Sequence, residues 1–185
     1  MNIKPIPLLA LAILFSGGPV RPQTTQTTDA NARVTFDPLN TVNVVLGKST
    51  PVAFTFHIKP GFHVNSNKPI SPELIPTQLG FTPPEDLVLA KMQYPAGVLT
   101  SFPFDPNEKL SVYSGDLTVK AVVLPAPKAT TGHFTVHGEL KYQACDNSAC
   151  YPPKRLPIQF DVKIVHGAAA TQRARPNAQS PHIHN

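Results

Sequence analysis

The fold is decided in residues 133–165, which read HFTVHGELKYQACDNSACYPPKRLPIQFDVKIV. Two long runs in this stretch alternate apolar and polar side chains with the period of two that is typical of half-buried strands. The segment between them holds both cysteines of the chain, Cys145 and Cys150. We therefore expect a hairpin whose turn carries the two thiols. The expected core-facing side chains are Phe134, Val136, Leu140 and Tyr142 on one strand and Ile158, Phe160, Val162 and Ile164 on the other.

The segment between the cysteines has the composition of a tight reversal. Asp146-Asn147-Ser148 favours a turn, since Asn and Asp tolerate the left-handed backbone that a reversal requires. A disulfide needs Cα atoms within about 7 Å, which two strand ends facing each other across a short turn can supply. Pro152-Pro153 removes two N–H donors soon after Cys150, so this cysteine is expected at a strand end.

The cysteine pair has two interpretations. As a structural bond it would contribute about 2 kcal/mol in the chain-entropy estimate, against nearly 5 for a loop of about 100 residues. Short loops nevertheless occur in purely structural disulfides. Spacing alone therefore leaves both a redox-active pair and a structural staple open.

The first 20 residues predict an export signal. Lys4 is a basic start, and residues 6–15 are an apolar run too short to span a bilayer. Small residues at 16–18 suit cleavage, but Pro19 is a poor residue after the cut, so the cleavage position and an uncleaved anchor stay open. Export places the cysteines in an oxidising compartment, where a disulfide can form and persist.

Charge argues against polyanionic partners. The net charge is +5, but four of the 16 basic side chains lie outside residues 22–172, which leaves 12 against 11 acidic ones. We expect no nucleic-acid partner and, once the signal is removed, no membrane insertion. We also expect a monomer.

The remaining pattern predicts an all-β protein, an immunoglobulin-like antiparallel β-sandwich. The chain has 22 prolines, no tryptophan and no useful helical window. We expect a disordered linker at 21–33, one domain at 34–166 and a disordered tail at 167–185. Besides the hairpin, the strand-like runs are residues 42–46, 52–58, 62–65, 77–82, 87–94, 110–113 and 117–124.

Several motifs together resemble a known family. From about residue 37 to 165 the chain is similar to the N-terminal periplasmic domain of the thiol:disulfide interchange protein DsbD. The most specific element is Tyr-Gln-x-Cys followed by Cys-x-Pro-Pro. The motifs, in the family's order, are residues 61–69 (GFHVNSNKP), 74–77 (LIPT), 94–95 (YP), 111–115 (SVYSG), 142–145 (YQAC) and 150–153 (CYPP).

The resemblance implies a periplasmic domain that shuttles electrons by thiol–disulfide exchange, without a bound cofactor, as part of a protein-disulfide reductase. Its donor would be a thioredoxin-like domain fed by a membrane reductase, both expected on separate chains. Its acceptors would be periplasmic thiol–disulfide proteins, including those of cytochrome c maturation. Cys150 would form the mixed disulfide, and Cys145 would be the resolving thiol. The rival is a non-catalytic binding or assembly module in which this disulfide is only a staple.

This chain departs from the family's best-known member near the thiols. One residue fewer separates the cysteines, and His63 and Asn65 stand where that member has tyrosines in the facing strand. His63 is therefore a candidate proton-transfer partner, since histidine titrates near neutral pH. It is otherwise an ordinary strand histidine. Asn65 and Tyr142 are expected as neighbours of the site.

Local charge and a proline-rich loop complete the candidate site. Asp146 should disfavour ionisation of Cys145, whereas the basic residues 154–155 should favour that of Cys150. Phe102 and Phe104 lie in SFPFDP, where the family has a cap loop that shields the disulfide. Alternatively, the two rings only seal the sandwich end.

We expect no metal site. The scattered histidines do not have zinc-ligand spacing with the thiols. They are His133, His137, His182 and His184.

Overall fold

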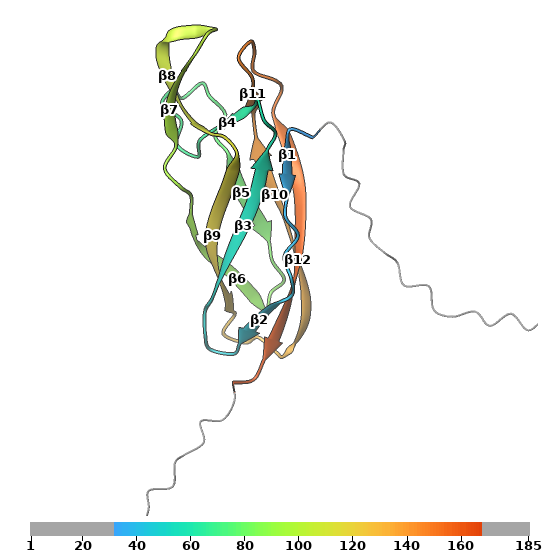
Figure 1. Ribbon diagram of the computed structural model, residues 1–185. Helices are drawn as coiled ribbons and strands as arrows, with labels where there is room; N and C mark the ends of the chain where they lie inside the picture. Colours follow the sequence, from blue (N-terminus) through green and yellow to red (C-terminus); the bar gives the residue numbers. More distant parts are fainter. Residues whose placement is uncertain (1–31, 168–185) are drawn as a thin grey trace, which may run out of the picture.

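The structure is a computed structural model that describes residues 32–167, a range with twelve strands and no helix (Figure 1). The predicted signal, nearly all of the predicted linker and the tail beyond Gly167 lie outside these residues. Within the described range no helix is long and apolar enough to cross a membrane. The strands are β1 Val34–Phe36, β2 Val42–Val45, β3 Thr50–Ile58, β4 His63–Asn65, β5 Gln78–Thr82, β6 Leu87–Gln93, β7 Val98–Phe102, β8 Asp105–Tyr113, β9 Asp116–Pro125, β10 Gly132–Tyr142, β11 Ala144–Cys145 and β12 Lys154–Val165.

Two four-stranded sheets form the body of the molecule, in the orders β1-β3-β9-β6 and β2-β12-β10-β5. They form the predicted immunoglobulin-like β-sandwich. Its strand pairs are antiparallel with one exception, because β2 runs parallel to the C-terminal end of β12. Period-two alternation explains the layering, since every second side chain of β3 and β9 is buried.

The predicted hairpin is confirmed, because β10 pairs with β12 from Gly132↔Ile164 to Tyr142↔Lys154. Its expected core-facing residues pack in one apolar cluster, which we call the main core. Phe54 lies fully buried in that cluster, with its ring centroid 4.8 Å from that of Phe81 and 5.3 Å from that of Phe160. The hairpin therefore belongs to the body of the sandwich and presents its turn at one end.

A third sheet, which the sequence did not predict, has the order β11-β4-β8-β7. We call it the small sheet. It lies at the same end of the molecule as the cysteine turn, opposite the end where β2 meets β12 (Figure 1). Its strand β11 contains Cys145 and pairs with β4. The small sheet therefore links the turn to the β7–β8 hairpin.

The expected loop around residues 101–106 is instead part of this β7–β8 hairpin. Two prolines had obscured its strands, but both lie where a missing N–H is tolerated. Pro103 falls in the short turn, and Pro106 lies in the irregular part of β8 between the pairs Phe102↔Asp105 and Ser101↔Lys109. Phe102 buries its ring with Leu110 and Val112, and this apolar contact stabilises the hairpin.

Candidate functional site

Cys145 and Cys150 form a disulfide across the predicted turn, with Cα atoms 4.0 Å apart. The two residues also form an isolated antiparallel bridge. Two backbone hydrogen bonds flank the disulfide: Asp146 N–H donates to the Ala149 carbonyl at 3.0 Å, and Tyr151 N–H donates to the Ala144 carbonyl at 2.9 Å. The turn residues thus close the chain on itself, as their composition predicts.

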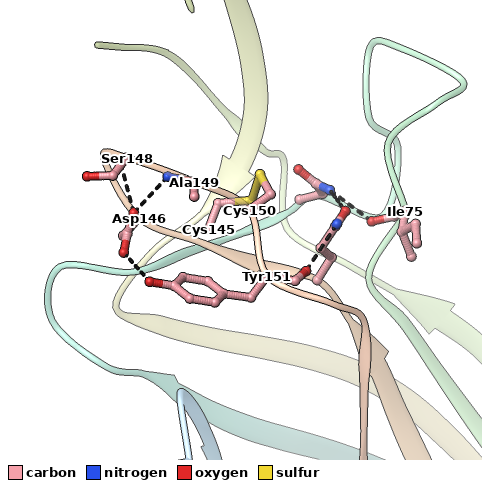
Figure 2. The surroundings of a disulfide bond; sticks show 9 residues. Ile75, Cys145, Asp146, Ser148, Ala149, Cys150 and Tyr151 are labelled. Atoms are coloured by element: carbon pink, nitrogen blue, oxygen red, sulfur yellow. Dashed lines mark hydrogen bonds between the residues drawn. A yellow bond between two sulfur atoms is a disulfide. The ribbon is translucent and has the colours of Figure 1, made fainter. Parts of the chain in front are cut away.

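The Asp146 carboxylate holds this turn together (Figure 2). Its Oδ1 accepts hydrogen bonds from the Ser148 N–H at 2.8 Å and the Ala149 N–H at 2.9 Å. Its Oδ2 accepts a hydrogen bond from the Tyr151 hydroxyl at 2.6 Å. The Tyr151 bond, followed by the two backbone bonds, lowers the pKa of the Asp146 carboxyl. The hydrogen bond to Asp146 in turn raises the pKa of the Tyr151 hydroxyl. The hydrogen bonds of the turn therefore favour the ionised form of Asp146.

Arg33 reaches the same turn from the segment before β1. Its guanidinium carbon lies 3.7 Å from the centroid of the Tyr151 ring and 5.2 Å from that of Phe62, which is within the range of cation–π contacts. Arg33 was not predicted as a site residue, because it stands just before the first periodic strand. Sequence order gives no signal for a contact between residues 118 positions apart, 33 and 151.

The two sulfurs differ in accessibility. Cys145 is fully buried at 0% exposure, whereas Cys150 is exposed. The two residues lie in different places: Cys145 is on β11 and pairs with the buried His63 of β4, whereas Cys150 lies just before the exposed Pro152-Pro153 pair. Only one sulfur of the disulfide therefore belongs to a residue with substantial solvent exposure.

Three rings stack beside the buried cysteine. His63, the strand partner of Cys145, is only 4% exposed and lies 3.8 Å from Phe102, centroid to centroid, with an interplanar angle of 13°. Phe104 stacks on the outer side of Phe102 at 5.6 Å and is 42% exposed. Phe102 is thus the inner ring of the two loop phenylalanines and Phe104 the outer one.

Burial lowers the pKa of the His63 imidazole, and the nearby Asp146 charge opposes this shift only in part. The His63 Nε2 atom is buried and has no hydrogen-bond partner within the described part of the chain. The neutral imidazole is therefore the favoured form in the folded protein.

The other predicted neighbours have structural contacts. Asn65 is fully buried; its side-chain amide donates to the Ile75 carbonyl at 3.0 Å and lies 3.4 Å from the Gln143 side-chain oxygen. Tyr142 is buried in the main core rather than in the stack of rings. Arg155, predicted to favour ionisation of Cys150, forms an ion pair with Glu139 on β10. No group of three or more His, Cys, Asp or Glu side chains within residues 32–167 is placed to hold a metal ion.

These features define a class of protein, a β-sandwich domain with one disulfide at the end of a hairpin. The family profile described as thiol:disulfide interchange protein DsbD, N-terminal, matches residues 31–161. The chain therefore belongs to the family of DsbD N-terminal domains, as the motifs predicted.

Three solved structures illustrate the similarity. The DsbD N-terminal domain of Neisseria meningitidis in its reduced form is 22% identical, over 62% of this chain and 77% of that one, with a TM-score of 0.36. The complex between the DsbD N-terminal and PilB N-terminal domains of the same organism is 21% identical, over 60% of this chain and 73% of that one, with a TM-score of 0.36. The N-terminal periplasmic domain of ScsB from Proteus mirabilis is 12% identical, over 69% of this chain and 44% of that one, with a TM-score of 0.41. A search of curated protein sequences gave no significant match.

Proposed function

We propose that this chain is a periplasmic thiol:disulfide interchange domain that relays electrons to protein disulfides through Cys145 and Cys150. The observation that carries the proposal is the unequal exposure of the pair, with a buried Cys145 and an exposed Cys150, in a member of the DsbD N-terminal family. A relay needs one sulfur that a partner can reach and a second that resolves the adduct.

The exchange runs in two steps. The Cys150 thiolate attacks one sulfur of a partner disulfide, so the partner's S–S bond breaks and its other sulfur leaves as a thiolate. The Cys145 thiolate then attacks the Cys150 sulfur, which releases the second partner thiolate and closes the Cys145–Cys150 bond. Two electrons pass to the partner, and the two protons of the domain's thiols end on the partner's thiols.

The proposed partners are proteins. Electrons enter from a thioredoxin-like donor supplied by a membrane reductase and leave to periplasmic thiol–disulfide proteins, including those of cytochrome c maturation. Family membership supports this scheme. It is also supported by the complex that a Neisseria meningitidis DsbD N-terminal domain forms with the PilB N-terminal domain.

The ring stack gives two further roles within the proposal. Phe102, with Phe104 outside it, covers the Cys145 side of the disulfide until a partner displaces the turn of the β7–β8 hairpin. His63 then accepts the proton of the Cys145 thiol during resolution. The position of His63 opposite Cys145 and its unpartnered Nε2 support this role.

The proposal is tested by redox equilibration. The oxidised domain is incubated in graded mixtures of reduced and oxidised glutathione, and its thiols are counted by alkylation and mass measurement. We expect a measurable dithiol fraction, because glutathione can reduce a working disulfide. Structural disulfides resist it, since their reduction potentials lie below about −300 mV. Cys145→Ser should trap a mixed disulfide with a partner, and its matched control Cys150→Ser should not.

The rival is a non-catalytic binding or assembly module. A pair that stays oxidised in moderately reducing buffer, together with no adduct on Cys145→Ser, would identify the disulfide as a structural staple. The proposed relay would then be wrong.

A further inference from the structure

The turn between the cysteines has its own hydrogen-bond system, which the exchange steps above do not use. Asp146 binds two backbone amides through one oxygen and the Tyr151 hydroxyl through the other, and none of these bonds involves sulfur. Asp146 directly follows Cys145, and Tyr151 directly follows Cys150. A single 2.6 Å bond between two side chains therefore joins the neighbours of the two cysteines.

The Tyr151 ring is itself held from outside the turn. Arg33 lies 3.7 Å from its centroid, and the Phe62 ring lies 6.0 Å away on the segment leading into β4. The Tyr151 N–H donates to the Ala144 carbonyl on β11. The tyrosine is thus fixed at its backbone, its ring and its hydroxyl.

We propose that Asp146, Tyr151 and Arg33 form a clamp, a set of positioning residues that holds Cys145 and Cys150 in bonding geometry when the disulfide is reduced. This inference rests on the proposed redox function. Its basis is that the contacts joining the two cysteine neighbours are made without either sulfur atom, so they do not require the S–S bond. In an unclamped turn the two thiols would separate after reduction, since a short exposed loop has many other conformations.

The clamp acts on the resolving step. When Cys150 is bound to a partner sulfur, Cys145 must reach the Cys150 sulfur to expel the partner thiolate and form the intramolecular bond. Holding the two residues together makes this an intramolecular attack at high effective concentration. The mixed disulfide is therefore short-lived, and the partner leaves with both electrons.

The clamp also sets the equilibrium. Prearranged thiols favour the disulfide over the dithiol, which lowers the reduction potential and makes the domain a stronger reductant. The Asp146 charge acts in the same direction, because a carboxylate next to Cys145 disfavours the thiolate. Variants must therefore separate geometry from charge.

The experiment compares Asp146→Ala, Tyr151→Phe and Arg33→Met with Asp146→Asn. Tyr151→Phe removes one bond of the clamp and keeps the aspartate charge, whereas Asp146→Asn removes the charge and keeps an oxygen for the two backbone amides. The matched control is Asp161→Asn. Asp161 accepts an exposed 2.8 Å bond from Thr135 on the same β10–β12 hairpin, away from the turn.

Two readouts are taken on each variant. The first is the equilibrium constant for disulfide formation against glutathione. The second is the release of thionitrobenzoate from the reduced domain with Ellman's reagent, in which Cys150 first forms the adduct and Cys145 then expels a second equivalent. Thermal unfolding of the oxidised protein checks that each variant folds.

We expect Asp146→Ala to lower the equilibrium constant about tenfold, which is a rise of about 30 mV in potential. Tyr151→Phe and Arg33→Met should lower it about threefold, in keeping with the loss of one hydrogen bond or cation–π contact. The second release should slow in the same order, and Asp161→Asn should match the wild type. If Asp146→Ala fails to fold, Tyr151→Phe still decides the matter.

Three results would overturn the clamp. Equal shifts in Asp146→Ala and Asp146→Asn, with Tyr151→Phe and Arg33→Met unchanged, would mean that the carboxylate acts by charge alone. If the wild-type domain exchanges normally and all variants have its equilibrium constant and its rate of second release, the clamp is refuted and the proposed function stands. A wild-type domain that does not exchange at all would refute both.

Discussion

The main core and the small sheet bury different kinds of side chain. The main core is a continuous cluster of Val, Leu, Ile and Phe with a few smaller or aromatic residues. The small sheet contributes Val64, Tyr113 and Ala144 to that cluster and buries three further apolar side chains in a cluster of its own. The polar side chains buried in the described range also lie in the small sheet or bond to it. They are His63, Asn65, Ser66, Thr77 and Ser111.

The difference shows how one domain combines stability with a defined site. Burial of apolar area is non-directional and stabilises the sandwich without fixing any one contact. The small sheet uses directional bonds, such as the 2.6 Å bond from the Thr77 hydroxyl to the Asn65 carbonyl and the 2.8 Å bond between the Ser66 and Ser111 hydroxyls. Directional bonds place β4, and β4 places His63 opposite Cys145.

The strongest test removes a ring from the main core. Phe54→Ala should lower the free energy of unfolding by about 3–5 kcal/mol, because it leaves a cavity among Phe81 and Phe160. Urea unfolding measures this loss. The control is Phe104→Ala, whose exposed ring should contribute little. Equal losses in the two variants would contradict the idea that the body carries the stability.

Removing one directional bond tests the small sheet. Thr77→Val keeps the side-chain shape but leaves the Asn65 carbonyl without this buried donor, so unfolding should become easier by about 1–3 kcal/mol. Thr135→Val, which removes an exposed bond, is the matched control. If both variants unfold like the wild type, the buried polar contacts do not stabilise the small sheet.

The stacked rings provide a kinetic comparison. Phe102→Ala should speed reduction of the disulfide by glutathione by up to about tenfold, the equivalent of one aromatic stacking interaction. Phe104→Ala should have a smaller effect, because Phe104 is the more exposed ring and stacks on Phe102, whereas Phe102 stacks directly on His63. Stopped alkylation over time measures both rates. A larger effect at Phe104 would reverse the assignment of inner and outer ring.

Acid should weaken the protein through His63. Because burial lowers its pKa in the folded state, the unfolded chain takes up the proton first as the pH falls below about 6.5. The contribution of the neutral His63 to the free energy of unfolding is therefore complete above that pH and declines below it. His63→Phe should flatten this part of the curve of unfolding free energy against pH. An unchanged slope in the variant would show that His63 does not carry the effect.

The smallest expected effect is the pH dependence that His57 gives to the stability of the sandwich, and it is opposite in sign to that of His63. His57 sits between Asp116 and Asp37, at 2.7 and 2.8 Å, and these contacts raise its pKa. Its contribution is complete below about pH 6.5 and is lost as the pH rises through the raised pKa. His57→Gln should remove this decline, measured by thermal unfolding across the range. The decline should also shrink with added salt, because the group is exposed.

Sequence periodicity predicted the sandwich well because its strands are long and alternate regularly, as in β3 and β9. It did not predict the small sheet. The strand-like runs at 62–65 and 110–113 correspond to β4 and the end of β8, but nothing in the sequence joined them into a sheet. β11 has only two residues, too few to show a period, and the prolines at 103 and 106 interrupt the pattern of β7 and the start of β8. The cysteine pair and its turn were evident from composition, but Arg33 was not.

By itself, the sequence determined the class of fold, the hairpin, the paired cysteines and the family, because each depends on local pattern or adjacent residues. The tertiary structure alone decided that Cys145 is buried and Cys150 exposed, that Phe102 stacks on His63, and that Arg33 reaches the Tyr151 ring. These features join residues far apart in the chain. Only the packing of the sheets brings them into contact.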